Sequence, residues 1–350
     1  MYRALVPEEQ ALMLVEGEVI GMTKRFSVAS GIVLILAAGA IASIAPLGWA
    51  TAQENAADTK SDWYPSKFGP DDTIGAANYI NEKTVRDAAK LVDRGKIYSL
   101  AVAVDPATPP RSYRRTSVTV VQVGFGDGKP FGPNQFTAND DAVYLWQGLG
   151  TQIDGFAHAG INFRYYNGVP ATEFVRPGGV TKFSVHNIPP LVARGVVLDF
   201  AGARGVEALK EGDAINVTEI REASKRQGVV LRKGDVVLLH TGWMDATKAM
   251  GPRMNINEPG LGLEGARYLA ELGVIAIGSD NDAVEVVPSE DRSLVMPVHQ
   301  EMLAKNGVYL LENIVTRELV NDKAWEFLFV LAAPRVVGAV QGNVHPVAIR

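Results

Sequence analysis

The sequence predicts an α/β protein in which helices flank a mixed β-sheet. Short runs of apolar and β-branched residues recur along the chain, and segments of helical character that end at glycine separate several of them. With 350 residues, of which 47% are hydrophobic and 21% charged, the chain can bury a large core. Such a mixture of strands and helices is typical of a sheet with helices packed on it.

The N-terminal region has the pattern of an export signal. No charged residue occurs from Phe26 to Gln53, a basic pair precedes this run, and Ala50-Thr51-Ala52 forms a small-x-small cleavage pattern. We expect residues 1–52 to be an N-terminal extension and signal peptide, so that the mature protein is periplasmic or secreted. The alternative is a membrane anchor that stays uncleaved, because the apolar run is long enough to span a bilayer.

After cleavage, no stable membrane span is expected. Residues 53–61 are polar and are expected to form a flexible tether, and residues 62–350 are expected to form one domain. The first helix should start after Asn81, a suitable N-cap, and close at Gly95.

The remaining elements follow from periodicity and from glycines at helix ends. Strands are expected at 96–104, 117–125, 141–148, 195–200, 235–243, 273–280, 307–315, 325–333 and 335–342. Helices are expected at 216–228, 262–273 and 297–307. Connections at 104–116, 124–140 and 243–262 are longer than ordinary loops, and long loops tend to frame functional sites.

Composition excludes several classes of function. The formal net charge is −5 and the pI is near 5.7, so nucleic acid is not an expected partner. The absence of cysteine excludes disulfides, thiolate metal sites and a cysteine nucleophile. No two of the 5 histidines have the i, i+4 spacing of a helical zinc site, and neither G-x-S-x-G nor G-x-x-x-x-G-K occurs.

One glycine pattern resembles a dinucleotide fingerprint. The stretch "GLGLEG" fits G-x-G-x-x-G, and Asp280 follows the next apolar run. The residues before it, "GPRMNINEP", have the composition of a loop, whereas the fingerprint requires a buried strand there. We therefore expect a helix N-terminus whose glycines allow close packing, and no dinucleotide cofactor.

The stretch "GTQIDGFAHAG" is the stronger candidate for chemistry. In an extended segment, the side chains of Gln152 and Asp154 point to the same side, because side-chain direction repeats every two residues. His158 can face the same space if the chain turns at Gly155. The alternative is a polar turn in which Asp154 bonds nearby amides and His158 is an ordinary half-buried residue.

A second stretch, "VHQEMLAKNGVYLLENI", supplies more potential ligands. It places His299 on a short helix and Glu312 at the end of the following strand, with a turn at Gly307 that can bring Glu312 back towards His299. An amide oxygen, two carboxylates and an imidazole suit a divalent ion such as Mn²⁺ or Zn²⁺. The alternative is a surface helix with an exposed histidine.

The chain resembles the metal-dependent cyclase family, whose members include kynurenine formamidase and isatin hydrolase. The family signature H-x-G-T-H-x-D-x-P-x-H corresponds to "GLGTQIDGFAH", residues 148–158. The resemblance also includes "WYPSKFGPDDTIGAANYI", "PGLGLEGARYLAELGVIAIGSDNDAVE" and "PVHQEMLAKNGVYLLEN", and so covers most of the mature chain. It implies a swivelling β/β/α fold, and it implies a homo-oligomer.

The resemblance implies a role for each matching residue. The metal ligands would be Gln152, Asp154, His299 and Glu312, and the catalytic residue would be His158. Gly148 stands where the family has its first histidine, and Gln147 could replace that histidine only if the loop shifted by one residue. The glutamine belongs to a G-T-Q-x-D variant branch, in which an amide oxygen replaces an imidazole and favours Mn²⁺ over Zn²⁺.

The activity implied is hydrolysis of a small amide, lactam or lactone by water that the metal ion activates, with His158 carrying the proton. Aromatic side chains near the motif could line an aromatic substrate pocket or could be core residues: Trp146, Phe156, Phe163, Tyr165 and Tyr166. Two other functions remain open. One is a periplasmic small-molecule binding protein without turnover, and the other is a metal-dependent lyase or hydratase with the same ion and base.

Overall fold

The structure, a computed structural model, describes residues 62–105, 114–123, 128–248 and 257–350. The expected signal peptide at 1–52 and the expected tether at 53–61 lie outside these ranges. Within them, no helix has the length and apolar character needed to cross a bilayer.

A mixed sheet of 9 strands forms the centre of the fold, in the order β1-β15-β13-β7-β9-β11-β12-β4-β14. Its strands are β1 (Ile97–Ser99), β4 (Gln152–Asp154), β7 (Leu191–Asp199), β9 (Val236–His240), β11 (Ala276–Ser279), β12 (Tyr309–Glu312), β13 (Glu326–Leu331), β14 (Gln341–Asn343) and β15 (Val347–Ile349). Four adjacent strands in the middle of the sheet, β7, β9, β11 and β12, run parallel to one another. All other pairs of neighbouring strands in this sheet are antiparallel. All residues of β9, β11 and β12 are buried, as in a parallel sheet covered on both faces.

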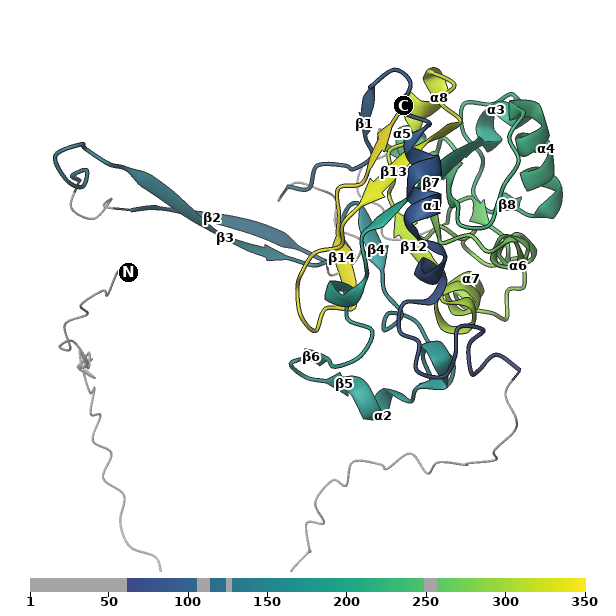
Figure 1. The fold of residues 1–350 in the computed structure, drawn as a ribbon, viewed down its shortest axis with the longest axis horizontal. Helices are drawn as coiled ribbons and strands as arrows, with labels where there is room; N and C mark the ends of the chain where they lie inside the picture. Colours follow the sequence, from purple (N-terminus) through teal and green to yellow (C-terminus); the bar gives the residue numbers. More distant parts are fainter. Residues whose placement is uncertain (1–61, 106–113, 124–127, 249–256) are drawn as a thin grey trace, which may run out of the picture. The chain divides into compact units, whose positions relative to one another are not determined.

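Helices separate many of the strands, as the alternation in the sequence predicts, and those between residues 200 and 306 lie in the connections between the parallel strands. They are α1 (Glu82–Ala89), α2 (Ala171–Phe174), α3 (Phe200–Arg204), α4 (Val217–Gln227), α5 (Trp243–Lys248), α6 (Leu263–Leu272), α7 (Pro297–His299), the π-helix η4 (Gln300–Asn306) and α8 (Arg317–Asn321). In Figure 1, α3, α4, α6 and α7 lie together on the right of the sheet. Their sequence signals are local: Asn81 caps α1, and Gly228, Gly273 and Gly307 follow α4, α6 and η4 in the left-handed conformation. The predicted fold class, a mixed sheet with flanking helices, is confirmed.

Two predicted boundaries are wrong, the first for a local reason and the second because of contacts between distant parts of the chain. The first helix ends at Ala89 and not at Gly95, because Leu91 and Val92 donate to carbonyls three residues back and tighten the chain into 3₁₀ turns. The strand expected at 335–342 begins only at Gln341. Residues 338 and 339 instead accept backbone hydrogen bonds from Val180 and Val185.

Other expected segments are shorter or contain extra elements. The strand expected at 96–104 is limited to β1, and residues 138–140 of an expected loop belong to a strand. The long connection at 243–262 begins with α5 and ends with β10 (Gly260–Leu261), which pairs with β8 (Ala214–Ile215). Residues 106–113, 124–127 and 249–256 of the expected loops lie outside the described residues.

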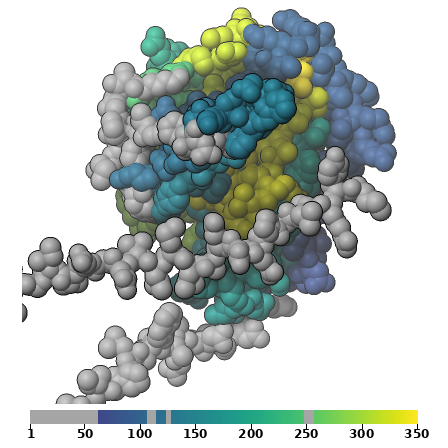
Figure 2. Space-filling view, turned by 90° about the vertical axis from the view of Figure 1, so that its left-hand side faces the viewer, coloured from purple at the N-terminus to yellow at the C-terminus, as the bar shows by residue number. Residues whose placement is uncertain are grey.

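Among the described strands, β2 (Thr116–Val123) and β3 (Ala138–Leu145) pair only with each other. They form an antiparallel ribbon that extends away from the nine-stranded sheet, at the left of Figure 1. Figure 2 shows the ribbon from its end, facing the viewer. A second small ribbon consists of β5 (Val175–Arg176) and β6 (Gly179–Val180).

Candidate metal and catalytic site

The site is built on β4, which lies between β12 and β14. Gln152 and Asp154 are two residues apart on this strand and therefore point to one face. Glu312, the last residue of β12, pairs directly with Gln152, and Gln341 of β14 pairs directly with Asp154. This register brings residues separated by 160 positions into contact, since the Gln152 Nε2 donates to Glu312 Oε2 at 2.7 Å.

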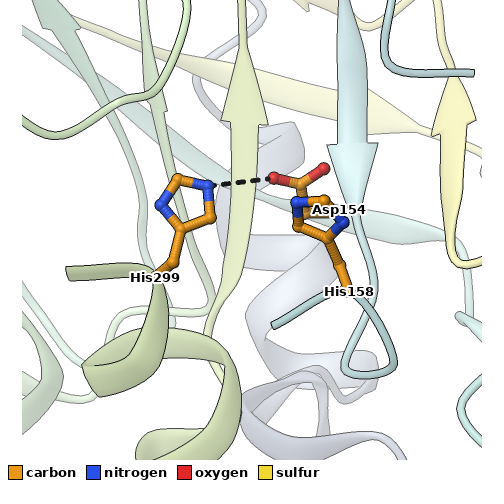
Figure 3. A group of neighbouring side chains, drawn as sticks. All are labelled: Asp154, His158 and His299. Carbon is orange, nitrogen blue, oxygen red and sulfur yellow. Dashed lines mark ion pairs between the residues drawn. The ribbon is translucent and has the colours of Figure 1, made fainter. Parts of the chain in front are cut away.

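His299 reaches the same place from the helix side. It ends α7, and its Nε2 lies 3.6 Å from Asp154 Oδ2 and 3.4 Å from Glu312 Oε1. Figure 3 shows its ring pointing at the Asp154 carboxylate. The structure therefore brings together Gln152, Asp154, His299 and Glu312, the set that the sequence analysis predicts as metal ligands, and all of them are buried.

Glu285 lies behind His299 and fixes the orientation of its ring. One oxygen of this buried carboxylate is 2.6 Å from His299 Nδ1 and also accepts from the His299 backbone N–H at 3.0 Å. The other oxygen accepts from the Val298 backbone N–H at 3.2 Å. With Nδ1 held by Glu285, the Nε2 atom of His299 is directed at Asp154 and Glu312.

His158 lies beside these groups because the chain turns after β4. Its backbone N–H donates to the Gly155 carbonyl at 3.0 Å, and its ring centroid is 5.8 Å from that of His299. Potential ligand atoms of Asp154, His158 and His299 all lie within 4.8 Å of one another. The turn expected at Gly155 is therefore present, and His158 faces the same space as Asp154.

The electrostatics of the site follow from burial and from its three carboxylates. Burial opposes the charge on His299, but the carboxylates of Asp154, Glu285 and Glu312 beside its ring raise its pKa well above the ordinary value. Burial also raises the pKa of Asp154, but the nearby His158 and His299 and the amide of Gln341 outweigh it and bring that pKa to about 2. Burial lowers the pKa of His158, although Asp154 partly opposes this. The cluster of acids thus favours a cation at its centre, while His158 favours the neutral form.

Within the part of the chain that the structure describes, two buried oxygens of the site have no hydrogen-bond partner, namely Gln152 Oε1 and Asp154 Oδ2. A buried polar atom without a partner is costly, and natural proteins leave few of them. Both atoms belong to the predicted ligand set, and both are hard oxygen donors. The residues present therefore fit a divalent cation, with these oxygens joined by an imidazole nitrogen and a second carboxylate.

The residues at and beside the positions that depart from the family signature make structural contacts. The Gln147 Oε1 accepts from the Asn343 backbone N–H at 2.9 Å, so this side chain holds β14. Gly148 is covered by the guanidinium of Arg114, whose Nη1 donates to the Gly148 carbonyl. Phe156, which stands at the position of the family's proline, stacks on Tyr309 with ring centroids 4.5 Å apart.

The aromatic residues near the motif divide into core and surface. Phe156 and Tyr166 are fully buried core residues, and Tyr165 packs against that core. Trp146 and Phe163 are exposed. For the two buried side chains, the core interpretation is the one that the structure supports.

His240 and the glycine-rich stretch have structural partners. The Nδ1 of the buried His240 is 2.7 Å from Thr316 Oγ1 and 3.3 Å from Asp280 Oδ2. The Asp280 carboxylate also accepts from the backbone N–H groups of Thr241 and Gly242, so it holds the loop that follows β9. As expected, "GLGLEG" leads into the N-terminus of a helix, α6.

Three residues at the site were not found by sequence reasoning: Glu285, Gln341 and Arg114. Gln341 donates from Nε2 to Asp154 Oδ1 at 2.8 Å, because β14 pairs with β4. Glu285 could have been suspected, since an acidic residue in the motif-bearing stretch "SDNDAVE" often orients a histidine ligand. Arg114 lies in the polar connection at 104–116, and no sequence motif there indicates a role at the site.

Comparison with known proteins supports the resemblance. The family model described as "Putative cyclase" matches residues 98–286, more than half of the chain. A crystal structure of a novel cyclase is 29% identical with a TM-score of 0.74, over 81% of this chain and 98% of the other. No curated protein matches the chain.

Two isatin hydrolases show a similar fold. Isatin hydrolase A from Ralstonia solanacearum is 20% identical with a TM-score of 0.54, over 77% of this chain and 98% of that protein. Isatin hydrolase A from Labrenzia aggregata, solved with benzyl benzoate, is 16% identical with a TM-score of 0.52, over 76% of this chain and 97% of that protein.

Proposed function

The chain belongs to the cyclase family, and from this premise we propose that it is a metal-dependent hydrolase of a small amide, lactam or lactone. The observation that carries the proposal is a pair of buried oxygens, Gln152 Oε1 and Asp154 Oδ2, that accept no hydrogen bond from the described residues and lie beside His299 and Glu312. Four side chains from two distant parts of the chain would hold one divalent ion. The amide and the two carboxylates favour a hard ion, so Mn²⁺ is preferred over Zn²⁺ in this proposal.

When bound, the divalent ion supplies a Lewis acid that makes water more acidic and polarises the substrate carbonyl. The protein residues position this chemistry. Gln341 and Gln152 donate to Asp154 Oδ1, at 2.8 and 3.4 Å, and so leave Oδ2 directed at His299. Glu285 holds the His299 ring in the orientation that presents Nε2.

His158 would move the proton. Because burial lowers its pKa, the imidazole is neutral near pH 7 and can accept a proton from the attacking water. A new C–O bond forms at the carbonyl carbon, the C–N bond of an amide or the C–O bond of a lactone breaks, and His158 returns the proton to the departing atom. Two fragments result from an open amide, and one ring-opened acid results from a lactam or lactone.

The proposal is tested by the metal content and the chelator sensitivity of the purified protein. We expect about one equivalent of divalent ion per chain and turnover of aryl amides, lactams or lactones that a chelator abolishes and Mn²⁺ or Zn²⁺ restores. Asp154→Asn should lose both metal and turnover. Asp71→Asn, at an exposed position, is the matched control and should keep both. Full activity in the metal-free protein would refute the proposal.

The other two functions give different results in the same experiments. A hydrolase incorporates oxygen-18 from labelled water into its product, whereas a lyase releases an unsaturated product without breaking an acyl bond. A binding protein retains metal and ligand affinity but turns over none of the substrates, so His158→Ala has no activity to remove.

We also propose that the protein is a homo-oligomer in which the β2–β3 ribbon contacts a second copy. Val118 and Val143 pair across one face, Tyr144 lies on the other, and Val120 is 64% exposed. A two-stranded ribbon is marginally stable alone, and exposed apolar patches mark interaction surfaces. Sedimentation equilibrium should show the wild type as an oligomer and Val120→Lys as a monomer. Val92→Lys, away from the ribbon, is the control and should leave the mass unchanged.

The location of the protein is proposed from the sequence pattern of residues 1–52. Cleavage after Ala52 would release a periplasmic or secreted chain that begins at Gln53. The intact mass of protein from the periplasmic fraction tests this, and a mass that includes residues 26–52 would show an uncleaved anchor.

A further inference from the structure

Arg114 places a positive charge at the edge of the candidate site. It lies just before β2, separated from it by Arg115, and its guanidinium lies over Gly148, in the turn that leads into β4. A Cβ atom added to Gly148 would lie 2.8 Å from the Arg114 Cζ and 2.9 Å from its Nη1. The guanidinium thus occupies the space that a side chain at position 148 would fill, and only a glycine there leaves room for it.

The hydrogen bonds of Arg114 leave part of its guanidinium available. Arginine carries five N–H donors in a planar fork. Among the described residues, the Gly148 carbonyl is the one acceptor within hydrogen-bond distance, and no described carboxylate forms an ion pair with Arg114. Arg114 is half-buried, and a partly buried guanidinium normally has an anionic partner.

Arg114 contacts the chain segment that leads into the strand of the proposed ligands. Its Nη1 donates to the Gly148 carbonyl, and Gly148 precedes Gln152 in this segment and stands where the family signature has its first histidine. Asp154 and Glu312 repel an anionic ligand, and a bound divalent ion would offset only part of that repulsion. A fixed cation beside Gly148 provides a place where a negatively charged group can approach.

We propose that Arg114 forms an anion subsite that binds a carboxylate carried by the substrate, next to the carbonyl that is hydrolysed. This inference rests on the proposed function for the reaction, and it adds that the preferred amides and lactones are acids. A guanidinium binds a carboxylate through two parallel N–H···O bonds, which fixes the orientation of the substrate as well as its affinity.

The test compares formanilide with its three carboxylated isomers, the N-formylaminobenzoates. We expect the wild type to prefer one of the acids by at least about tenfold in kcat/KM, with the difference mainly in KM. Arg114→Gln should remove this preference and leave formanilide turnover within about twofold of the wild type. Gly148→Ala should do the same, because the added methyl group displaces the guanidinium. Arg115→Gln is the matched control at the neighbouring exposed position and should keep the preference.

Two results would overturn the proposal. One is a preference for the acid that survives in Arg114→Gln, and the other is an equal loss of activity on the acid and on formanilide. Calorimetry with benzoate and benzamide separates this proposal from the proposed function. If no variant turns over any substrate, the hydrolase proposal fails, but benzoate binding that is lost in Arg114→Gln still supports the anion subsite. Equal benzoate affinity in both proteins refutes it.

Discussion

Glu285→Gln replaces the negative charge behind His299 with a neutral amide of nearly the same size. In the wild type, the Glu285 carboxylate accepts from His299 Nδ1 at 2.6 Å and from the backbone N–H groups of His299 and Val298 at 3.0 and 3.2 Å. A glutamine has only one acceptor oxygen. If that oxygen stays with His299, the new NH₂ group faces the Val298 N–H, and two donors then lie opposite each other.

The expected size of the effect follows from these contacts. Loss of the charged partner of a histidine ligand costs about 10- to 100-fold in metal affinity, or about 1.4–2.7 kcal/mol. In the metal-free protein, the lost charge-assisted bonds should lower the free energy of unfolding by about 1.5–3 kcal/mol. Both effects arise because Glu285 is buried and water cannot replace it.

Competition with a chelator of known affinity measures the dissociation constant of Mn²⁺ or Zn²⁺, and urea denaturation followed by circular dichroism measures stability. Glu271→Gln, at an exposed position, is the control and should change neither quantity. Metal affinity of Glu285→Gln within twofold of the wild type would refute the idea that Glu285 orients a ligand. If Glu285→Gln lowers stability but leaves metal affinity unchanged, Glu285 stabilises the fold and does not orient a metal ligand.

Other predictions concern the proton carrier and the sheet. His158→Ala should reduce kcat by about 10²- to 10⁴-fold while metal content stays unchanged, which activity assays and metal analysis check together. His158 must be neutral to act as the base, and its pKa is lowered from 6.5. We therefore expect kcat/KM to stay high at pH 7 and to fall only as the pH drops below 6.5. A midpoint of the pH–kcat/KM profile above pH 7 would contradict the assignment of His158 as the base. Gly195→Ala should destabilise the protein by about 1–3 kcal/mol in urea denaturation, because its Cβ would overlap the ring of Phe327 on β13. Gly178→Ala has open space around its Cβ and is the control, expected within about 0.5 kcal/mol of the wild type.

The parts of the fold that could be predicted from the sequence are those with local causes. Asn81 begins a helix because its side chain accepts from the Lys83 and Thr84 backbone N–H groups. Glycine ends α4 and α6 because the next residue must adopt a left-handed conformation. The early end of α1 could not be predicted because no glycine or proline marks it in the sequence. The short β14 could not be predicted because the residues before it bond to Val180 and Val185, which are distant in the sequence.

The residues of the candidate site also fall into those that the sequence predicts from local causes and those that it does not predict. The common face of Gln152 and Asp154 follows from the two-residue period of a strand, and the return of Glu312 towards His299 follows from the turn at Gly307. The positions of Glu285, Gln341 and Arg114 depend on which elements become neighbours. Strand order and helix docking are not written in any short stretch of sequence, so these residues could be identified only in the structure.

The position of β4 between β12 and β14 has a consequence for the timing of maturation. Its side chains face their partners only when both neighbouring strands are in register, and a slip by one residue would turn Gln152 and Asp154 to the opposite face. A growing chain therefore cannot complete the strand pairing that holds the proposed ion site until residue 341 has left the ribosome. If the chain is exported unfolded, in line with the location proposed from residues 1–52, the proposed metal ion would bind only at the destination, and the ions available there would determine which one is bound.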